Sequence, residues 1–113
     1  MFARLMGLAT ISPEELLGLI ERRAATVIDV NSRSSWLRAH VPGSRTLDHA
    51  NYHAGDLPAS LDAPIVFYCS NPFCRKAPLA ARRARGFGYT DVRVMPAGIT
   101  GWMAARLPTE SGG

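Results

Sequence analysis

An α/β fold with a mainly parallel central sheet is the architecture that this sequence predicts, on three observations. Short β-branched runs without polar alternation, typical of strands buried on both faces, occur at 26–30 and 65–68. Helical patterns alternate with these runs, as right-handed crossovers between parallel strands require. The length of 113 residues suits one domain. We therefore expect a single domain over 1–113, with helices on both faces of the sheet.

The first predicted helix, over 13–23, begins at a capping signal. Ser12 can cap the helix end, Pro13 suits its first position, and Glu15 completes a capping box. The elements expected after it are a strand at 26–30, a short helix near 32–37, a short strand near 46–47, a strand at 65–68, a helix over 79–85, a strand at 92–95 and a last helix over 98–105.

The helix at 79–85 is predicted to pack through an alanine-rich face. Pro78 is tolerated only in the first turn of a helix, so the preceding loop is expected to extend to about Ala77. Leu79, Ala80 and Ala84 are expected to face the core, with the arginines outward.

The charge is mildly basic, with 13 Lys and Arg against 9 Asp and Glu. The densest cluster, Arg82, Arg83 and Arg85, has no aromatic residue among its members, so we expect no nucleic-acid partner. No run of 18 apolar residues and no cleavable leader is recognisable, so we expect no membrane association and a cytoplasmic location.

The two cysteines point to site chemistry. Cys69 directly follows the strand at 65–68, and ligands of parallel sheets bind beyond the carboxyl ends of strands. The following helix start is expected to lower the pKa of Cys69 and favour the nucleophilic thiolate. The alternative is a small buried residue that ends a strand. The backbone N–H groups expected to converge on an anion are those of Ser70, Asn71, Phe73, Cys74 and Arg75.

Two features of this loop allow more than one interpretation. Cys74 can act as a resolving thiol, line a pocket or simply pack. Arg75 and Lys76 are either anion-binding groups or solvated charges. The residues expected to bind substrate are Ser70, Asn71, Phe73, Cys74, Arg75 and Lys76.

Three motifs in order, the first made of a strand end and the turn that follows it, resemble the rhodanese-like family of sulfurtransferase domains. They are a strand end at 27–31, a His-Val-Pro-Gly-Ser turn at 40–44, the pair Tyr68-Cys69, and Ala-Gly-Ile-Thr-Gly-Trp at 97–102. The resemblance extends from Ile11 to Pro108, so the core is expected at about 11–108. It implies a rhodanese-like fold in which Cys69 takes up sulfane sulfur as a persulfide and passes it on.

The resemblance also implies partners. The donor is expected to be a small sulfur-containing anion such as thiosulfate, or a protein persulfide, and the acceptor a thiol or a cyanide-like nucleophile. No cofactor is expected. No metal site is expected either, because His40, His49 and His53 show no ligand spacing with the cysteines.

Departures from the family pattern leave two other functions open. Asn31 stands where the family usually has Arg, and Ser35 where it usually has Glu. The loop lacks the usual glycine, and Cys69 to Arg75 forms the Cys-x5-Arg pattern of rhodanese-related phosphatases and arsenate reductases. The alternatives are therefore a small oxyanion enzyme of that type and a non-catalytic binding module.

Overall fold

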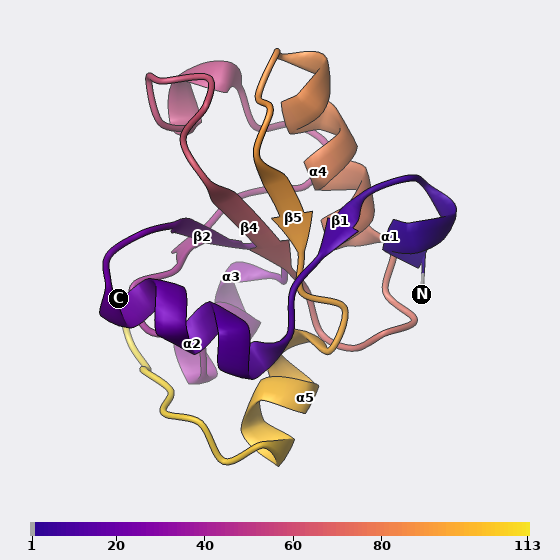
Figure 1. The fold of residues 1–113 in the computed structure, drawn as a ribbon. Coiled ribbons are helices and arrows are strands. Elements are labelled where there is room, and N and C mark those ends of the chain that lie inside the picture. The colour runs from indigo at the N-terminus through magenta and orange to yellow at the C-terminus, as the bar shows by residue number, and fades with distance from the viewer. Residues whose placement is uncertain (1) are drawn as a thin grey trace.

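The computed structural model describes residues 2–113 and contains a five-stranded sheet between helices (Figure 1). The strands are β1 (Ala9–Thr10), β2 (Thr26–Asp29), β3 (Arg45–Thr46), β4 (Ile65–Tyr68) and β5 (Val92–Val94). The helices are α1 (Phe2–Leu5), α2 (Pro13–Glu21), α3 (Arg33–Arg38), the 3-10 turn η1 (Ala54–Asp56), α4 (Lys76–Gly86) and α5 (Gly98–Ala104).

The sheet has the strand order β1-β5-β4-β2-β3, and all four pairings are parallel. β4 lies in the middle, with Ile65 to Tyr68 paired to Thr26 to Asp29 on one side and to β5 on the other. The predicted α/β class with a mainly parallel sheet is confirmed. The carboxyl ends of β2 and β4 therefore lie next to each other.

The start of α2 has the capping contacts that the sequence predicts. Ser12 Oγ accepts from the Glu15 N–H at 3.1 Å, and Glu15 Oε1 accepts from the Ser12 N–H at 3.0 Å. Pro13 takes the first position, as predicted. The helix ends at Glu21 rather than residue 23, because Arg22 caps it and Arg23 adopts a left-handed φ of 52°.

The start of α4 was predicted too late. The helix begins at Lys76, since Pro78 falls in the first turn, where its missing N–H costs no helical hydrogen bond. The loop after Cys69 consequently ends at Arg75. The inward placement of Leu79 is also wrong, because 45% of that residue is exposed. The buried face consists of Ala77, Pro78, Ala80, Ala81 and Ala84.

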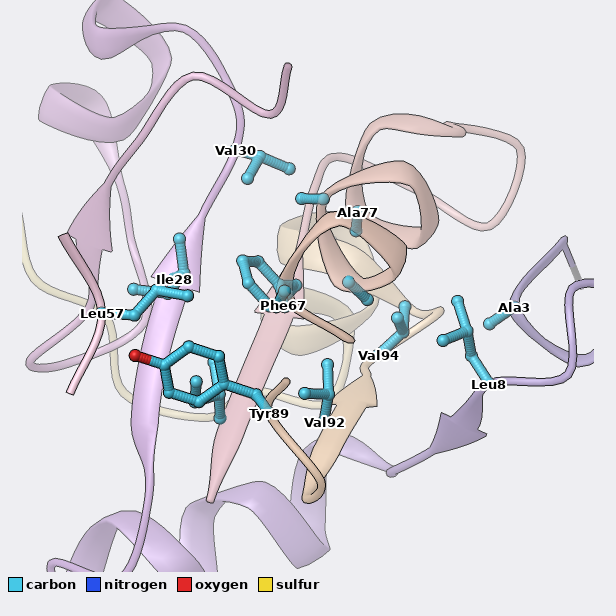
Figure 2. Close-up of a cluster of buried hydrophobic side chains, with 14 of the residues drawn as sticks. Ala3, Leu8, Ile28, Val30, Leu57, Phe67, Ala77, Tyr89, Val92 and Val94 are labelled. Atoms are coloured by element: carbon cyan, nitrogen blue, oxygen red, sulfur yellow. The ribbon is translucent and has the colours of Figure 1, made fainter. Parts of the chain in front are cut away.

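Two apolar clusters cover the two faces of the sheet. One joins α1 and α4 to the side chains of Ile28, Phe67 and Val94, as Figure 2 shows, and includes Cys69. The other joins α2 and α5 to the opposite face and includes the fully buried Trp102. Helices therefore lie on both faces, as the sequence predicts.

Three short elements, α1, β1 and η1, have no counterpart in the sequence prediction. β1 contains two residues and depends on pairing with β5, where Ala9 lies opposite Arg93. Within 2–113, no helix has the length and apolar character needed to cross a lipid bilayer.

Candidate functional site

Cys69 lies at the carboxyl end of the central strand, on the face that α4 covers. Its side chain belongs to the same apolar cluster as Phe67 and Val30, and only 3% of the residue is exposed. The carbonyl of Cys69 accepts a hydrogen bond from the Ile99 N–H at 2.9 Å. The sheet below and α5 beside it therefore fix the position of the thiol.

The segment 70–75 curls over this thiol. The Cys74 N–H donates to the Asn71 carbonyl at 3.2 Å, and the Phe73 N–H donates to Asn71 Oδ1 at 2.9 Å. The expectation that the Phe73 and Cys74 amides point at an anion is therefore wrong, because both are bonded within the loop. Asn71 shapes the curl through its carbonyl and its side chain.

The beginning of α5 supports the other side of the loop. The Thr100 N–H donates to the Ser70 carbonyl at 3.0 Å. Gly98, with a left-handed φ of 65°, packs so tightly that an added Cβ would lie 2.5 Å from the Ser70 carbonyl carbon. The sequence prediction did not assign this contact, although Gly98 lies in the family motif at 97–102.

The two cysteines of the site are in direct contact. The Cys69 thiol donates to the Cys74 carbonyl oxygen at 3.6 Å, and the two thiols are close enough for each to shift the pKa of the other. Both cysteines are free thiols, with Cys69 buried and Cys74 half-buried. The curl of the loop therefore produces a thiol pair from residues five positions apart.

The expected lowering of the Cys69 pKa is wrong. Burial, followed by the hydrogen bond to Cys74, raises the pKa of Cys69 to about 12, although the N–H groups of Ala77 and Ser70 act in the opposite direction. Burial of the thiol is a property of the folded packing, which the position after a strand does not reveal.

Cys74 shows the opposite behaviour. Partial burial works to raise its pKa, but hydrogen bonds outweigh it and lower the pKa below its usual value. They come from Cys69, from the Lys76 N–H and from Ser70. Of the two thiols, Cys74 has the lower pKa and therefore ionises first as pH rises.

This ordering predicts the order of alkylation. We expect iodoacetamide at pH 7.5 to modify Cys74 before Cys69, because the reactive form is the thiolate and Cys74 is the more accessible. Peptide mass spectrometry over a time course measures the two rates, and the Cys74→Ser variant reports Cys69 alone. Earlier modification of Cys69 would contradict the assigned order.

A pocket of about 470 Å³ lies at the carboxyl end of β2, the strand next to the one that leads to Cys69, and neither cysteine lines it. Its walls are the end of β2, the segment after β3 and the first residue of α4. The Val30 N–H bonds to the Tyr68 carbonyl at 3.0 Å, so this wall adjoins the end of β4 and hence Cys69. The lining residues include Asn31, Arg33, Asp48, His49 and Lys76.

The structure brings most of the predicted site residues together at one edge of the sheet. Ser70 and Cys74 lie at the thiol pair, and Lys76 reaches the pocket. Phe73 and Arg75 are exposed, Phe73 to 71%. The sequence analysis did not connect the pocket residues Arg33 and His49 with the site, because both precede Cys69 by more than 15 residues. Among residues 2–113, no group of three or more metal-ligating side chains is close enough to bind a metal ion.

Comparisons with known proteins identify the family of this chain. The model of the rhodanese-like domain matches residues 12–105. The chain belongs to the rhodanese-like domain family. The thiosulfate sulfurtransferase GlpE of Ectopseudomonas mendocina is 31% identical over 101 residues, which cover 89% of each chain.

Two further relatives are longer than this rhodanese-like chain. The HTH-type transcriptional regulator Rv0324 of Mycobacterium tuberculosis is 31% identical over 134 aligned positions, which cover 97% of this chain and 59% of the regulator. The crystal structure of a thiosulfate sulfurtransferase from Pseudomonas aeruginosa has a TM-score of 0.85 at 18% identity, and covers 99% of this chain and 22% of that one. The similarity to the Pseudomonas aeruginosa structure is one of fold alone.

Asp29 lies in the strand-end motif of this rhodanese-like chain and is fully buried. Its Oδ1 accepts the Asn31 N–H at 2.7 Å, while its Oδ2 has no hydrogen-bond partner among residues 2–113. Burial raises the pKa of Asp29 above its usual value. The folded protein therefore binds the Asp29 proton more tightly than the unfolded chain does.

The raised pKa of Asp29 predicts that the free energy of unfolding depends on pH. Above the pKa of an unfolded aspartate, about 4, stability falls as pH rises through the higher pKa of the folded state. We expect Asp29→Asn to remove this fall and to raise the free energy of unfolding at pH 7, since the amide oxygen can still accept the Asn31 N–H. Urea unfolding from pH 4.5 to 8 measures both effects. A variant with the parent's pH dependence would contradict the raised pKa.

Proposed function

We propose that this chain is a sulfurtransferase in which Cys69 carries sulfane sulfur as a persulfide. The observation that carries the proposal is the place of Cys69 at the end of β4, under a curled loop and against the first turn of α4. The N–H groups of Ser70 and Ala77 bond to its sulfur and stabilise negative charge there. The family and the GlpE relative support the same reaction class.

The loading step has a defined route for its proton. As Cys69 attacks the outer sulfur of thiosulfate, its proton passes to the Cys74 thiolate, which lies within hydrogen-bond reach. A bond forms between Cys69 and the sulfane sulfur, the S–S bond of thiosulfate breaks, and sulfite leaves with the electron pair. In this proposal Cys74 accepts the proton that Cys69 loses, and the N–H groups of Ser70 and Ala77 stabilise the negative charge that forms on the Cys69 sulfur.

Transfer to an acceptor reverses this proton movement. A nucleophile such as cyanide attacks the outer sulfur of the persulfide and leaves as thiocyanate. Cys69 departs from that sulfur and recovers its proton from Cys74. The pocket at the carboxyl end of β2, with Arg33 and Lys76 on its walls, is the proposed position of the anionic donor or acceptor.

Intact-protein mass spectrometry tests the proposal directly. We expect incubation with thiosulfate to add one sulfur atom, which peptide mapping assigns to Cys69 and which cyanide removes as thiocyanate. A protein persulfide or polysulfide serves as a second donor if thiosulfate is not used. No sulfur on Cys69 from any of these donors would contradict the proposal and favour a binding module.

The same site predicts very weak phosphatase activity. The pocket contributes the carboxyl of Asp48, but hydrogen bonds from the Ala50 N–H and the Asn51 side chain lower its pKa. An ionised carboxylate cannot donate a proton to a leaving phenolate. We expect hydrolysis of p-nitrophenyl phosphate far below about 1 per second, an ordinary enzyme rate. Turnover near that rate in the parent, lost in Cys69→Ser, would favour the oxyanion-enzyme function.

A further inference from the structure

The thiol pair supports a second reaction, and the inference rests on the proposed persulfide at Cys69. Two hydrogen bonds to Asn71 curl the loop and bring Cys74 back over the strand end. The Cys69 sulfur then lies 3.6 Å from the Cys74 carbonyl oxygen, in direct contact with the residue that carries the second thiol. Disulfide closure needs two Cα atoms within about 7 Å, which an extended segment of this length would not provide.

The environment of Cys74 suits an attacking thiol. The Lys76 N–H and Ser70 bond to its sulfur and stabilise the thiolate, and the residue is half-buried rather than enclosed. The chain contains two cysteines, so no third thiol competes for Cys69. A thiolate held beside a persulfide is the arrangement that thiol–disulfide exchange requires.

We propose that Cys74 is a resolving cysteine that converts the Cys69 persulfide into hydrosulfide and a Cys69–Cys74 disulfide. Cys74, which took up a proton during loading, passes it to the outer sulfur of the persulfide, and the resulting thiolate attacks the inner sulfur, which is Cys69 Sγ. A bond forms between the two cysteine sulfurs, and the bond from Cys69 Sγ to the outer sulfur breaks. The electron pair leaves with the outer sulfur as hydrosulfide. The sulfane sulfur is reduced and the two cysteines are oxidised, so no external oxidant is needed.

Attack on the inner sulfur is favoured over attack on the outer sulfur for two reasons. The inner sulfur is the atom that already faces Cys74. Attack on the outer sulfur would instead expel Cys69 as a thiolate in a buried site, where burial raises the pKa of Cys69 and disfavours that charge. Exchange proceeds faster when the leaving group is the weaker base, which here is hydrosulfide.

The product determines the kind of partner that completes the cycle. The loop disulfide closes the site to further sulfur uptake, because Cys69 is no longer free. A dithiol reductant reopens it by exchange, giving two cysteine thiols and the oxidised reductant. The chain would then act as a dithiol-dependent sulfide-releasing enzyme, in addition to transferring sulfur to external nucleophiles.

The test follows a single turnover without reductant. Parent and Cys74→Ser are loaded with polysulfide until peptide mapping shows the same occupancy of Cys69, and the donor is removed by gel filtration. For the parent we expect one sulfide released per persulfide and a protein lighter by two hydrogens than the reduced form. For Cys74→Ser we expect a persulfide lifetime at least about tenfold longer and no internal disulfide.

Controls separate the possible outcomes. Leu79→Ala changes an exposed residue of α4 and is expected to release sulfide like the parent, whereas Cys74→Ala checks that the serine hydroxyl has no effect of its own. Equal persulfide lifetimes in parent and Cys74→Ser would overturn the resolving role and leave the sulfurtransferase proposal intact. Failure of every donor to load Cys69 would overturn both. Equilibration in glutathione redox buffers tests separately whether the two cysteines can form a disulfide. Mixed disulfides with glutathione, without an internal Cys69–Cys74 disulfide, would also contradict the proposed closure.

Discussion

Replacing Cys69 by serine is expected to reduce sulfur transfer at least about a thousandfold, to the uncatalysed background. A serine hydroxyl does not form a persulfide, and the Cys69 sulfur is the atom proposed to carry the transferred sulfur. Thiocyanate formation from thiosulfate and cyanide measures the loss. The fold is expected to survive, although a buried hydroxyl in place of a thiol costs about 1–2 kcal/mol of stability.

A second variant and a folding measurement show whether the loss of activity in Cys69→Ser comes from loss of the thiol itself. Cys69→Ala is expected to be equally inactive without introducing a buried hydroxyl, so inactivity shared by both variants cannot come from polarity. Circular dichroism and urea unfolding show whether each variant is folded at the assay temperature. Transfer by a folded Cys69→Ser at the parent's rate would show that another residue is the sulfur carrier.

The second large effect is expected from Gly98→Ala. The φ of 65° disfavours any side chain, and the new Cβ would lie 2.5 Å from the Ser70 carbonyl carbon and 2.7 Å from the Asn71 nitrogen. Backbone atoms cannot rotate away as a flexible side chain does, so the loop start or α5 must shift. We expect a loss of at least about 2 kcal/mol in the free energy of unfolding.

The same shift is expected to reduce sulfur loading of Cys69 at least about tenfold, because displacing Ser70 moves an N–H that bonds to the Cys69 sulfur. Urea unfolding and the rate of sulfur uptake measure the two effects at a temperature where the variant is folded. Gly86→Ala is the matched control, since nothing lies within 4 Å of its added Cβ. Parent-like loading in Gly98→Ala would show that this contact does not position the loop.

Features encoded by neighbouring residues were predicted best from the sequence. The cap of α2 depends on Ser12, Pro13 and Glu15, which lie within four positions of one another, and it was predicted correctly. The buried strand at 65–68 was identified at its observed bounds because every residue in it is apolar. The rhodanese-like fold then followed from motifs spread over the whole chain.

Features that depend on distant contacts were missed. β1 exists because Ala9 and Thr10 pair with β5, more than 80 positions away. The start of α4 carries no side-chain cap at Arg75, so the sequence offers no local signal for it.

The electrostatics of the candidate site were hardest to predict. A thiol after a strand and before a helix suggested a low pKa, but the pKa depends on burial by residues from several elements. The structure assigns the lowered pKa to Cys74 and the raised pKa to Cys69. Of the amides expected to converge on an anion, those of Phe73 and Cys74 bond to Asn71 within the loop instead.

The central position of β4 has a consequence for the entropy of substrate binding. β4 is paired on both sides, and Cys69 follows directly from it, so the backbone that carries this sulfur is already ordered before any ligand arrives. Fixing one residue's backbone costs roughly 1–2 kcal/mol in lost conformational freedom. If the backbone loses conformational entropy when the donor binds, the loss occurs in the loop at 70–75, because the strand is already ordered. The free energy of donor binding can therefore be used mainly to orient the donor, since the Cys69 sulfur is held in place by the sheet.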